Sequence, residues 1–311
     1  MAKIVILEAH NSNPGDLSWE EIEKLGCVTI YQRTTQDQII ERAAEADILI
    51  TNKLKISAEI LGHLPQLQLV HQLATGTDNI DKEAAKKQGV EVMNAVGYST
   101  TAVAQHVFAL ILEITSLVAV HNSAVKSGEW SKSGDWCYML KTPVELTGKN
   151  LGVIGFGKIG QAVAKLGLAF GMNVLVYSNH ATASQYTDVT IVGLNELAQQ
   201  SDFVSLHSPL TDKTEGIIDH DFLSKMKSTA FLINTARGGH VVEKDLYDAL
   251  KNEKIAGAGL DVTSQEPIES DNPLLTLDNC IITPHIAWTA FESRRRLIGI
   301  VAQNIRSFLE A

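Results

Sequence analysis

Short apolar runs alternate with amphipathic helical patterns along most of the chain. Residues 3–7 have the pattern of a strand, and a helix is expected from residue 39, because Thr35 and Gln38 have the spacing of a capping box. The same pattern predicts further strands at 48–51, 67–71, 90–93, 151–154, 174–177, 203–206, 230–234, 258–261 and 280–282. Strands that alternate with helices across short connections indicate parallel sheets covered by helices.

The most apolar part of the chain is expected to be a buried helix. From Thr100 onward, apolar side chains recur at three- and four-residue spacing as far as Val118, which predicts a broad apolar helix face. Gln105, His106 and Glu113 lie inside this stretch, so a core helix is favoured over a membrane span.

Length and composition limit the possible classes of protein. At roughly 150 residues per domain, 311 residues predict about two domains. With 45% hydrophobic and 20% charged residues, the chain is expected to be globular. The last helix is predicted to begin at Thr289, with Glu292 completing a second capping box.

Charge and cysteine content indicate the partners and the compartment. Lys and Arg total 26 against 36 Asp and Glu, a net charge of −10, so neither nucleic acid nor an anionic membrane surface is an expected partner. Cys27, Cys137 and Cys280 are odd in number and far apart, and they form no C-x-x-C motif. This pattern favours a reducing, cytoplasmic location.

A glycine-rich turn follows the apolar run at 151–154 and opens an Ala-rich helix. In this G-x-G-x-x-G pattern Gly155 permits the tight turn, Gly157 lets the backbone approach a pyrophosphate, and Gly160 lets the helix pack on the strand. Backbone N–H groups at the helix start, at Lys158 and Ile159, are expected to bind phosphates. The pattern predicts a dinucleotide site.

The next strand lacks the acidic residue that would bind the adenosine ribose hydroxyls of NAD. Ser178 occupies the expected acidic position and is followed by Asn179 and His180. Without a carboxylate a 2′-phosphate is not repelled, so NADP is admissible, but no Arg is present there to require it. Asn179 or His180 is a candidate phosphate contact, the alternative being that they are exposed loop residues.

Three later segments each place a chemically suitable residue at the end of a predicted strand. Arg237 precedes a Gly-Gly pair, where its guanidinium can bind a carboxylate through two hydrogen bonds. Asp261 ends the next run, Glu266 lies in the following loop, and His285 ends the run after that. Such strand ends open into the ligand crevice of a doubly wound sheet, and a His beside a carboxylate suits a general acid for carbonyl reduction. A core or capping role is the alternative for His285 and Glu266.

These motifs occur together with several others in one order. The segments are LATGTDNID at 73–81, GYSTTAVAQH at 97–106, GVIGFGKIGQAVA at 152–164, HSPLT at 207–211, NTARGG at 234–239, GLDV with EP at 259–267, and PHIAW at 284–288. From end to end the chain resembles the D-isomer-specific 2-hydroxyacid dehydrogenase family. TNK at 51–53, DWCY at 135–138 and PHIAW are most similar to its glycerate dehydrogenase (hydroxypyruvate reductase) branch.

The resemblance implies an α/β fold of two Rossmann-like, doubly wound parallel-sheet domains. A substrate domain, residues 1–98 and 286–311, would be split by an inserted dinucleotide-binding domain, residues 99–285. The implied enzyme uses NAD or NADP to interconvert small 2-keto acids and D-2-hydroxy acids, with hydroxypyruvate/D-glycerate and glyoxylate/glycolate as the first candidates. The family commonly forms homodimers through its cofactor domains.

The resemblance also implies roles for individual residues. Arg237 would bind the substrate carboxylate and polarise the carbonyl, His285 would donate the proton, and Glu266 would be its partner. Lys53, Thr75 and Gly76 would also bind substrate, and Trp136 would either reach a neighbour's site or pack in the interface. The implied cofactor contacts, besides the glycine turn, are Thr101, Ser178, Asn179, His180, His207, Ser208, Pro209, Thr235, Ala236, Asp261 (on the nicotinamide carboxamide) and Ala287. No metal is expected.

Two alternatives remain open at this point. A fold does not fix a function, and the same fold serves in transcriptional corepressors that bind nicotinamide cofactors. Such corepressors can retain the Arg–Glu–His set, so this set does not distinguish them from an enzyme. A dehydrogenase of another D-2-hydroxy acid, such as D-lactate or phosphoglycerate, is the second alternative.

Overall fold

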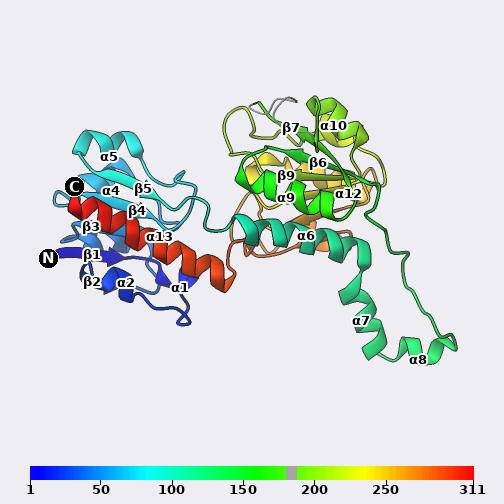
Figure 1. The fold of residues 1–311 in the computed structure, drawn as a ribbon, viewed down its shortest axis with the longest axis horizontal. Coiled ribbons are helices and arrows are strands. Elements are labelled where there is room, and N and C mark those ends of the chain that lie inside the picture. The colour runs from blue at the N-terminus through cyan, green and yellow to red at the C-terminus, as the bar shows by residue number, and fades with distance from the viewer. Residues whose placement is uncertain (180–187) are drawn as a thin grey trace. The chain divides into compact units, whose positions relative to one another are not determined.

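The structure, a computed structural model, describes residues 1–179 and 188–311. The described chain folds into two units, one formed by Met1–Ser99 with Trp288–Ala311 and the other by Thr100–Ala287. Each unit has a parallel β-sheet with helices on its faces, as Figure 1 shows. The predicted α/β class with two doubly wound domains is therefore confirmed.

The first unit contains a five-stranded sheet in the order β2-β1-β3-β4-β5. Its strands are β1 (Ala2–Ile6), β2 (Gly26–Ile30), β3 (Ile48–Thr51), β4 (Leu69–Gln72) and β5 (Glu91–Asn94). Its helices are α1 (Ala9–Ser12), α2 (Glu20–Glu23), α3 (Ile39–Ala43), α4 (Ala58–Gly62), α5 (Lys82–Gln88) and α13 (Phe291–Glu310), with a 3-10 turn at Gln36–Gln38. Every residue of β3 and β4 is buried, so these two strands form the centre of this core.

The first predicted capping box is present and the second is not. The Thr35 backbone N–H donates to Gln38 Oε1 at 3.1 Å at the start of the 3-10 turn. At the last helix the prediction was wrong, because α13 begins at Phe291 and Ala290 is its N-cap.

An ion pair of Arg294 accounts for the start of α13. Arg294 Nη1 and Nη2 each lie 2.7 Å from a carboxylate oxygen of Asp16, and Arg294 Nε donates to the Thr289 carbonyl at 2.8 Å. These bonds fix Thr289 ahead of the first helical turn through its backbone oxygen. The helix start is thus set by a contact to a residue far away in the sequence.

The second unit contains a seven-stranded sheet in the order β12-β11-β10-β9-β6-β7-β8. Its strands are β6 (Asn150–Ile154), β7 (Asn173–Tyr177), β8 (Thr190–Ile191), β9 (Phe203–Leu206), β10 (Phe231–Asn234), β11 (Gly257–Leu260) and β12 (Cys280–Ile282). Its helices are α6 (Thr100–Ser116), α7 (Val118–Lys126), α8 (Glu129–Ser133), α9 (Lys158–Ala169), α10 (Leu194–Gln200), α11 (His220–Lys225) and α12 (Glu243–Lys251), with 3-10 turns at Gly238–His240 and Pro273–Thr276. Because neighbouring strands of this sheet are parallel, the carboxyl ends of the strands meet at one edge.

The apolar helix face that begins at Thr100 is shorter than predicted. Val103, Val107 and Ile111 are buried, but α6 ends at Ser116, and Leu117 adopts a left-handed φ of 55°. Val118 starts α7 and is 63% exposed, so the expected continuation to Val118 was wrong. In the part of the chain that the structure describes, no single helix has the length and hydropathy to span a membrane; α6 and α7 have them only as a pair, bent by 53°.

A buried histidine joins the sheet of the first unit to α13. His71 in β4 is fully buried, and its Nδ1 donates to the Gln72 carbonyl at 3.0 Å. Its Nε2 therefore accepts from Asn304 Nδ2, 3.0 Å away. Burial lowers the pKa of His71 to about 4, so the ring is neutral in the folded protein.

This histidine is predicted to make folding sensitive to mild acid. The unfolded chain takes up a proton at His71 below about pH 6.5, whereas the folded chain does so only near pH 4. The contribution of His71 to the free energy of unfolding is therefore present above pH 6.5 and is lost as the pH falls from 6.5 to 4. By pH 5 the loss is about 2 kcal/mol. Urea unfolding of wild type and His71→Gln at pH 7.5 and pH 5 measures this. Equal losses in the two proteins would contradict the assignment.

Candidate active site

A histidine–carboxylate pair lies at the carboxyl edge of the second sheet. His285 follows β12, and its Nδ1 is 2.7 Å from Glu266 Oε2, in the loop after β11. The two side chains are 24% and 32% exposed, so the pair is open to a ligand. Since a carboxylate only accepts, Nδ1 carries the proton and Nε2 is left to act on a substrate.

The backbone that carries His285 is held by a buried carboxylate. Asp261, directly after β11, is 1% exposed. Its Oδ1 accepts from the Thr283 hydroxyl at 2.6 Å and from the Ile286 amide at 2.9 Å, and its Oδ2 accepts from the Ala287 amide at 2.8 Å. Burial would raise the pKa of Asp261, but hydrogen bonds from His106, Thr283 and these amides outweigh it and lower the pKa.

The turn at His285 is tight. Its backbone N–H donates to the Thr283 carbonyl at 3.0 Å, and its φ is 55°, a left-handed value unusual for a residue other than glycine. Such a conformation persists only when its surroundings fix it, and Asp261 does so by binding residues on both sides of His285.

A second histidine, His106 in α6, completes this network. Its Nε2 lies 3.0 Å from Thr283 Oγ1 and 3.4 Å from Asp261 Oδ1. The Thr283 hydroxyl has one hydrogen, which it gives to Asp261, so His106 Nε2 must be the donor. His106 lies in the quoted segment GYSTTAVAQH, but the sequence does not show that this helix contacts the end of β11.

Arg237 follows β10 at the same sheet edge, with β11 between it and β12. Arg237 is partly buried, and its Nη1 donates to the Ala236 carbonyl at 2.7 Å. A methyl group on Gly238 would overlap the Thr263 carbonyl, so the loop after β10 packs directly on the loop after β11. Arg237, Glu266 and His285 therefore come from three loops of one sheet edge.

The glycine turn has the geometry that a dinucleotide needs. Gly155 has a φ of 91°, and a methyl group there would overlap Ser208; at Gly160 it would overlap the Gly155 carbonyl. Gly157 differs, because its φ is ordinary and a methyl group there would meet nothing within 4 Å. The protein's own packing thus requires the first and third glycines, and the second leaves open space at the N-terminus of α9 for a phosphate.

A further observation supports a cofactor on this edge. The Thr235 hydroxyl, just after β10, is buried and has no hydrogen-bond partner among the described residues. Buried polar atoms are nearly always satisfied, so a bound group is expected to supply its partner. The residues present therefore fit a nicotinamide dinucleotide.

A cavity of about 420 Å³ lies beside the glycine turn. Its lining comes from the turn itself, from the end of β7 and from the loop after β9. Seven of the predicted cofactor residues line it, namely Gly155, Gly157, Ser178, Asn179, His207, Ser208 and Pro209. His180 lies outside the described residues.

The remaining predicted residues of this unit lie nearby in the fold. Thr101 is exposed in the first turn of α6, Ala236 follows β10, and Ala287 is buried where it binds Asp261. Lys158 and Ile159 form the first turn of α9. Their cofactor contacts stay predictions.

The substrate residues predicted from the resemblance in the first unit also follow strands. Lys53 follows β3, and Thr75 and Gly76 follow β4. Glu8, which sequence reasoning missed, fixes the turn of Lys53. Its Oε2 accepts from the Thr51 hydroxyl at 3.0 Å and from the backbone amides of residues 52, 53 and 54 at 2.8, 2.9 and 3.1 Å.

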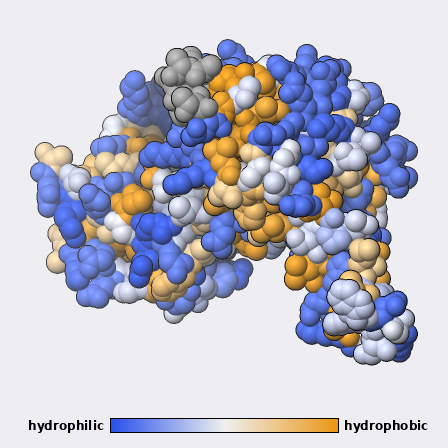
Figure 2. All heavy atoms as spheres, turned by 45° about the vertical axis from the view of Figure 1, so that its right-hand side comes forward, coloured by the Kyte–Doolittle hydropathy of each residue, from blue (hydrophilic) through white to orange (hydrophobic). Residues whose placement is uncertain are grey.

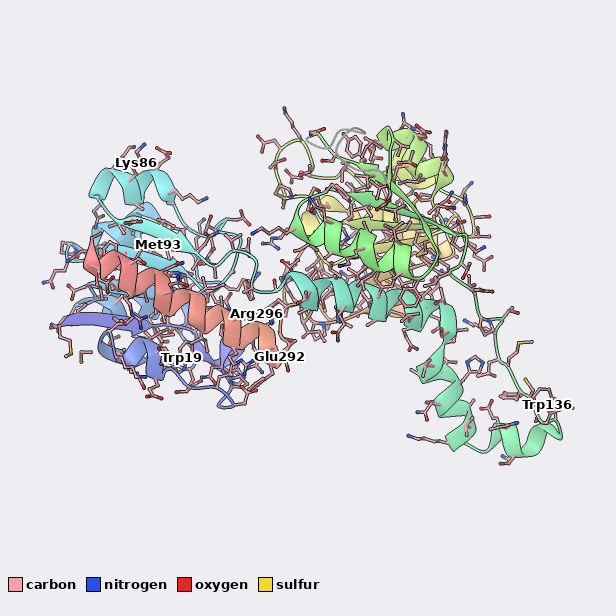
Figure 3. The ribbon with its side chains drawn as sticks, in the orientation of Figure 1. Trp19, Lys86, Met93, Trp136, Glu292 and Arg296 are labelled. Atoms are coloured by element: carbon pink, nitrogen blue, oxygen red, sulfur yellow. The ribbon has the colours of Figure 1, made fainter. Side chains whose placement is uncertain are left out.

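Trp136 lies in an extended segment of the second unit. Helices α7 and α8, with the following residues to 145, project from its sheet; we call residues 118–145 the arm (Figures 1 and 2). Trp136 lies beyond α8 and is 91% exposed (Figure 3). Val120, Val125 and Met139 of the arm are also exposed.

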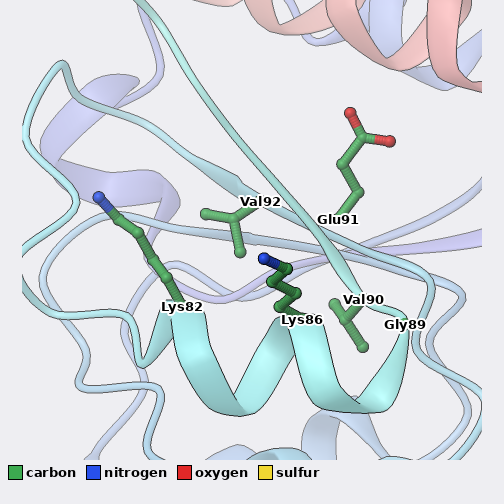
Figure 4. A pocket seen from close by; sticks show the side chains of 6 residues that line it. All are labelled: Lys82, Lys86, Gly89, Val90, Glu91 and Val92. Atoms are coloured by element: carbon green, nitrogen blue, oxygen red, sulfur yellow. The ribbon is translucent and has the colours of Figure 1, made fainter.

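A second cavity, of about 370 Å³, lies in the first unit between α5 and β5 (Figure 4). Lys82, Lys86 and Glu91 line it together with a glycine and two valines. None of the predicted site residues lines it. Among the described residues, no cluster of His, Cys, Asp or Glu could hold a metal.

Comparison with known proteins places the chain in a family. Residues 108–287 match a family model described as the NAD binding domain of D-isomer specific 2-hydroxyacid dehydrogenases. A hydroxypyruvate reductase of Blautia hydrogenotrophica is 44% identical over 99% of this chain and 97% of its own length.

Two solved structures cover 99% of the chain. One is an acyclic imino acid reductase in complex with NADPH and D-arginine, with a TM-score of 0.88, 32% identity and 97% of its chain covered. The other is a D-lactate dehydrogenase from Aquifex aeolicus with NAD and lactic acid, with a TM-score of 0.86, 31% identity and 95% of its chain covered.

A dinucleotide-binding turn and a histidine–glutamate pair on one sheet edge are the features of an oxidoreductase that uses a nicotinamide cofactor. The comparisons narrow this class. The chain belongs to the D-isomer specific 2-hydroxyacid dehydrogenase family, as the sequence motifs predicted. The family model is that of an NAD binding domain, so the expected nicotinamide dinucleotide cofactor, NAD or NADP, is confirmed.

Gly157 and Gly160 are predicted to respond differently to the same substitution. Gly157→Ala should leave the melting temperature of the cofactor-free protein unchanged, because the methyl group meets no protein atom, but should weaken cofactor binding by about tenfold or more. Gly160→Ala is the matched variant and should lower the melting temperature, because its methyl group overlaps Gly155. Calorimetric titration and thermal unfolding measure both effects. Unchanged cofactor affinity in Gly157→Ala would contradict the proposed phosphate position.

Proposed function

We propose that this enzyme reduces small 2-keto acids to D-2-hydroxy acids, with hydroxypyruvate and glyoxylate as its substrates. The observation that carries the proposal is the 2.7 Å pair of His285 and Glu266 beside a cofactor site, in a chain 44% identical to a hydroxypyruvate reductase. The TNK, DWCY and PHIAW segments support the same branch.

The chain's own residues account for the proton and for substrate orientation. Glu266 holds the Nδ1–H of His285, which leaves Nε2 to carry a proton to the carbonyl oxygen of the substrate. Arg237 binds the substrate carboxylate and aligns the adjacent carbonyl. A bound NADH or NADPH supplies the hydride for the carbonyl carbon. Lys53, Thr75 and Gly76 are proposed to bind the substrate from the first unit, and Trp136 to contact a second subunit.

An absorbance assay at 340 nm tests the proposed substrates. It crosses NADH and NADPH with hydroxypyruvate, glyoxylate, pyruvate and phosphohydroxypyruvate. We expect the highest kcat/KM with hydroxypyruvate or glyoxylate. A higher value with pyruvate or phosphohydroxypyruvate, or no turnover of any acid, would reject the substrate proposal.

Replacement of the proton donor is predicted to reduce turnover. His285→Ala should lower kcat by about 10² to 10⁴-fold, the usual range for general acid–base catalysis, with cofactor affinity retained. His63→Ala, at an exposed histidine of the first unit, is the control and should keep wild-type turnover. Near-normal kcat in His285→Ala would contradict the assignment.

We also propose a cytoplasmic homodimer. The three cysteines are free thiols, which supports the cytoplasmic location. The arm exposes Val120, Val125 and Trp136, and burial of these side chains against a second copy supports the dimer. Sedimentation equilibrium should give twice the chain mass of 33.8 kDa, and Val125→Asp should shift it toward one chain mass. A single-chain mass for the wild type would contradict the dimer.

A further inference from the structure

The cavity beside the glycine turn has a charge that favours one of the two possible cofactors. Its lining includes Ser178 and Asn179, directly after β7, where a carboxylate would bind the ribose hydroxyls of NAD. No acidic residue is among the described residues that line the cavity. A 2′-phosphate on the adenosine ribose therefore meets no opposing negative charge there.

The lining also contains a cation that the sequence alone did not place there. Lys213 lies in the loop after β9 and lines the same cavity as Ser178. The two segments are separated in the sheet by β6, which carries the glycine turn. Desolvation lowers the pKa of His207, another lining residue, to about 3, so this ring is neutral at pH 7. Lys213 is then the positive charge in the described part of the lining.

The loop that carries Lys213 is fixed by its own hydrogen bonds. Thr214 Oγ1 donates to the Pro209 carbonyl at 2.7 Å and accepts from the Thr211 amide at 2.8 Å. The Thr214 amide in turn donates to the Thr211 carbonyl at 2.8 Å. Lys213, between these two threonines, is therefore attached to an ordered turn at the rim of the cavity, although its side chain is exposed. An ammonium group on such a turn can bind phosphate as a compact charge.

We infer that Lys213 selects NADPH over NADH by binding the 2′-phosphate of the adenosine ribose, beside Ser178. The inference rests on the proposed function only in that the cavity holds the adenosine half of the cofactor; it does not depend on which keto acid is reduced. A hydrogen bond to a charged group contributes enough to change affinity by about 10- to 100-fold. We therefore expect a preference of that size for the 2′-phosphorylated ligand.

Calorimetric titration with nucleotide fragments tests the inference without catalysis. The ligands are adenosine 2′,5′-bisphosphate and 5′-AMP, and the proteins are wild type, Lys213→Gln and Ser178→Asp. Wild type should bind the bisphosphate about tenfold or more tighter than 5′-AMP. Lys213→Gln should weaken only the bisphosphate, by about tenfold, and Ser178→Asp should make 5′-AMP the preferred ligand. Lys254→Gln, at an exposed lysine outside this cavity, is the matched control and should behave as wild type.

Three results of the titrations would overturn the inference. They are equal or weaker binding of the bisphosphate by wild type, unchanged bisphosphate affinity in Lys213→Gln, and an equal loss for both ligands in that variant. The proposed function fails separately, because absence of keto-acid turnover leaves these affinities untouched. Conversely, if the enzyme reduces hydroxypyruvate rapidly and its kcat/KM for NADH is at least as high as that for NADPH, the proposed function stands and the role of Lys213 is rejected.

Discussion

The buried carboxylate of Asp261 is the constraint on which the catalytic edge depends. An ionised carboxylate is unfavourable in a protein interior unless hydrogen bonds compensate its lost solvation. Here the compensation comes from the Thr283 hydroxyl and the amides of Ile286 and Ala287, on both sides of His285. The groups that stabilise the charge are thus the same groups that fix the turn of His285. His106 adds a donor from α6 and so connects this turn to the long helix of the same unit.

On the cofactor side of the same sheet edge, the geometry depends on close approach between backbone segments rather than on a buried charge. Gly155 and Gly160 allow the turn, the loop after β9 and the start of α9 to come together, and Gly157 leaves space above the helix N-terminus. Because all the strands run parallel, this turn, Arg237 and His285 open at one edge. The positive charge of Lys213 lies in the lining of the cavity beside this turn, together with the uncharged Ser178.

The regular parts of this fold were predictable because they depend on local pattern. Strands β3, β9 and β12 were predicted with their observed bounds. The pair of Glu266 and His285 was implied by the family resemblance and is present in the structure. Edge strand β2 was not predicted, since only part of it is buried. The wrong start of α13 and the missed residues Glu8, His106 and Lys213 share one cause: each depends on a contact between segments that only strand order and helix packing bring together.

In the proposed mechanism Glu266 fixes the ring of His285 so that Nε2 faces the substrate. Nitrogen-15 NMR of the histidine side chains tests it, with the His285 signals assigned by comparison with His285→Asn among the ten histidines. The neutral ring should carry its proton on Nδ1 in wild type, and Glu266→Gln should lose this preference because the charged acceptor is gone. A neutral His285 protonated on Nε2 in the wild-type enzyme would contradict the account.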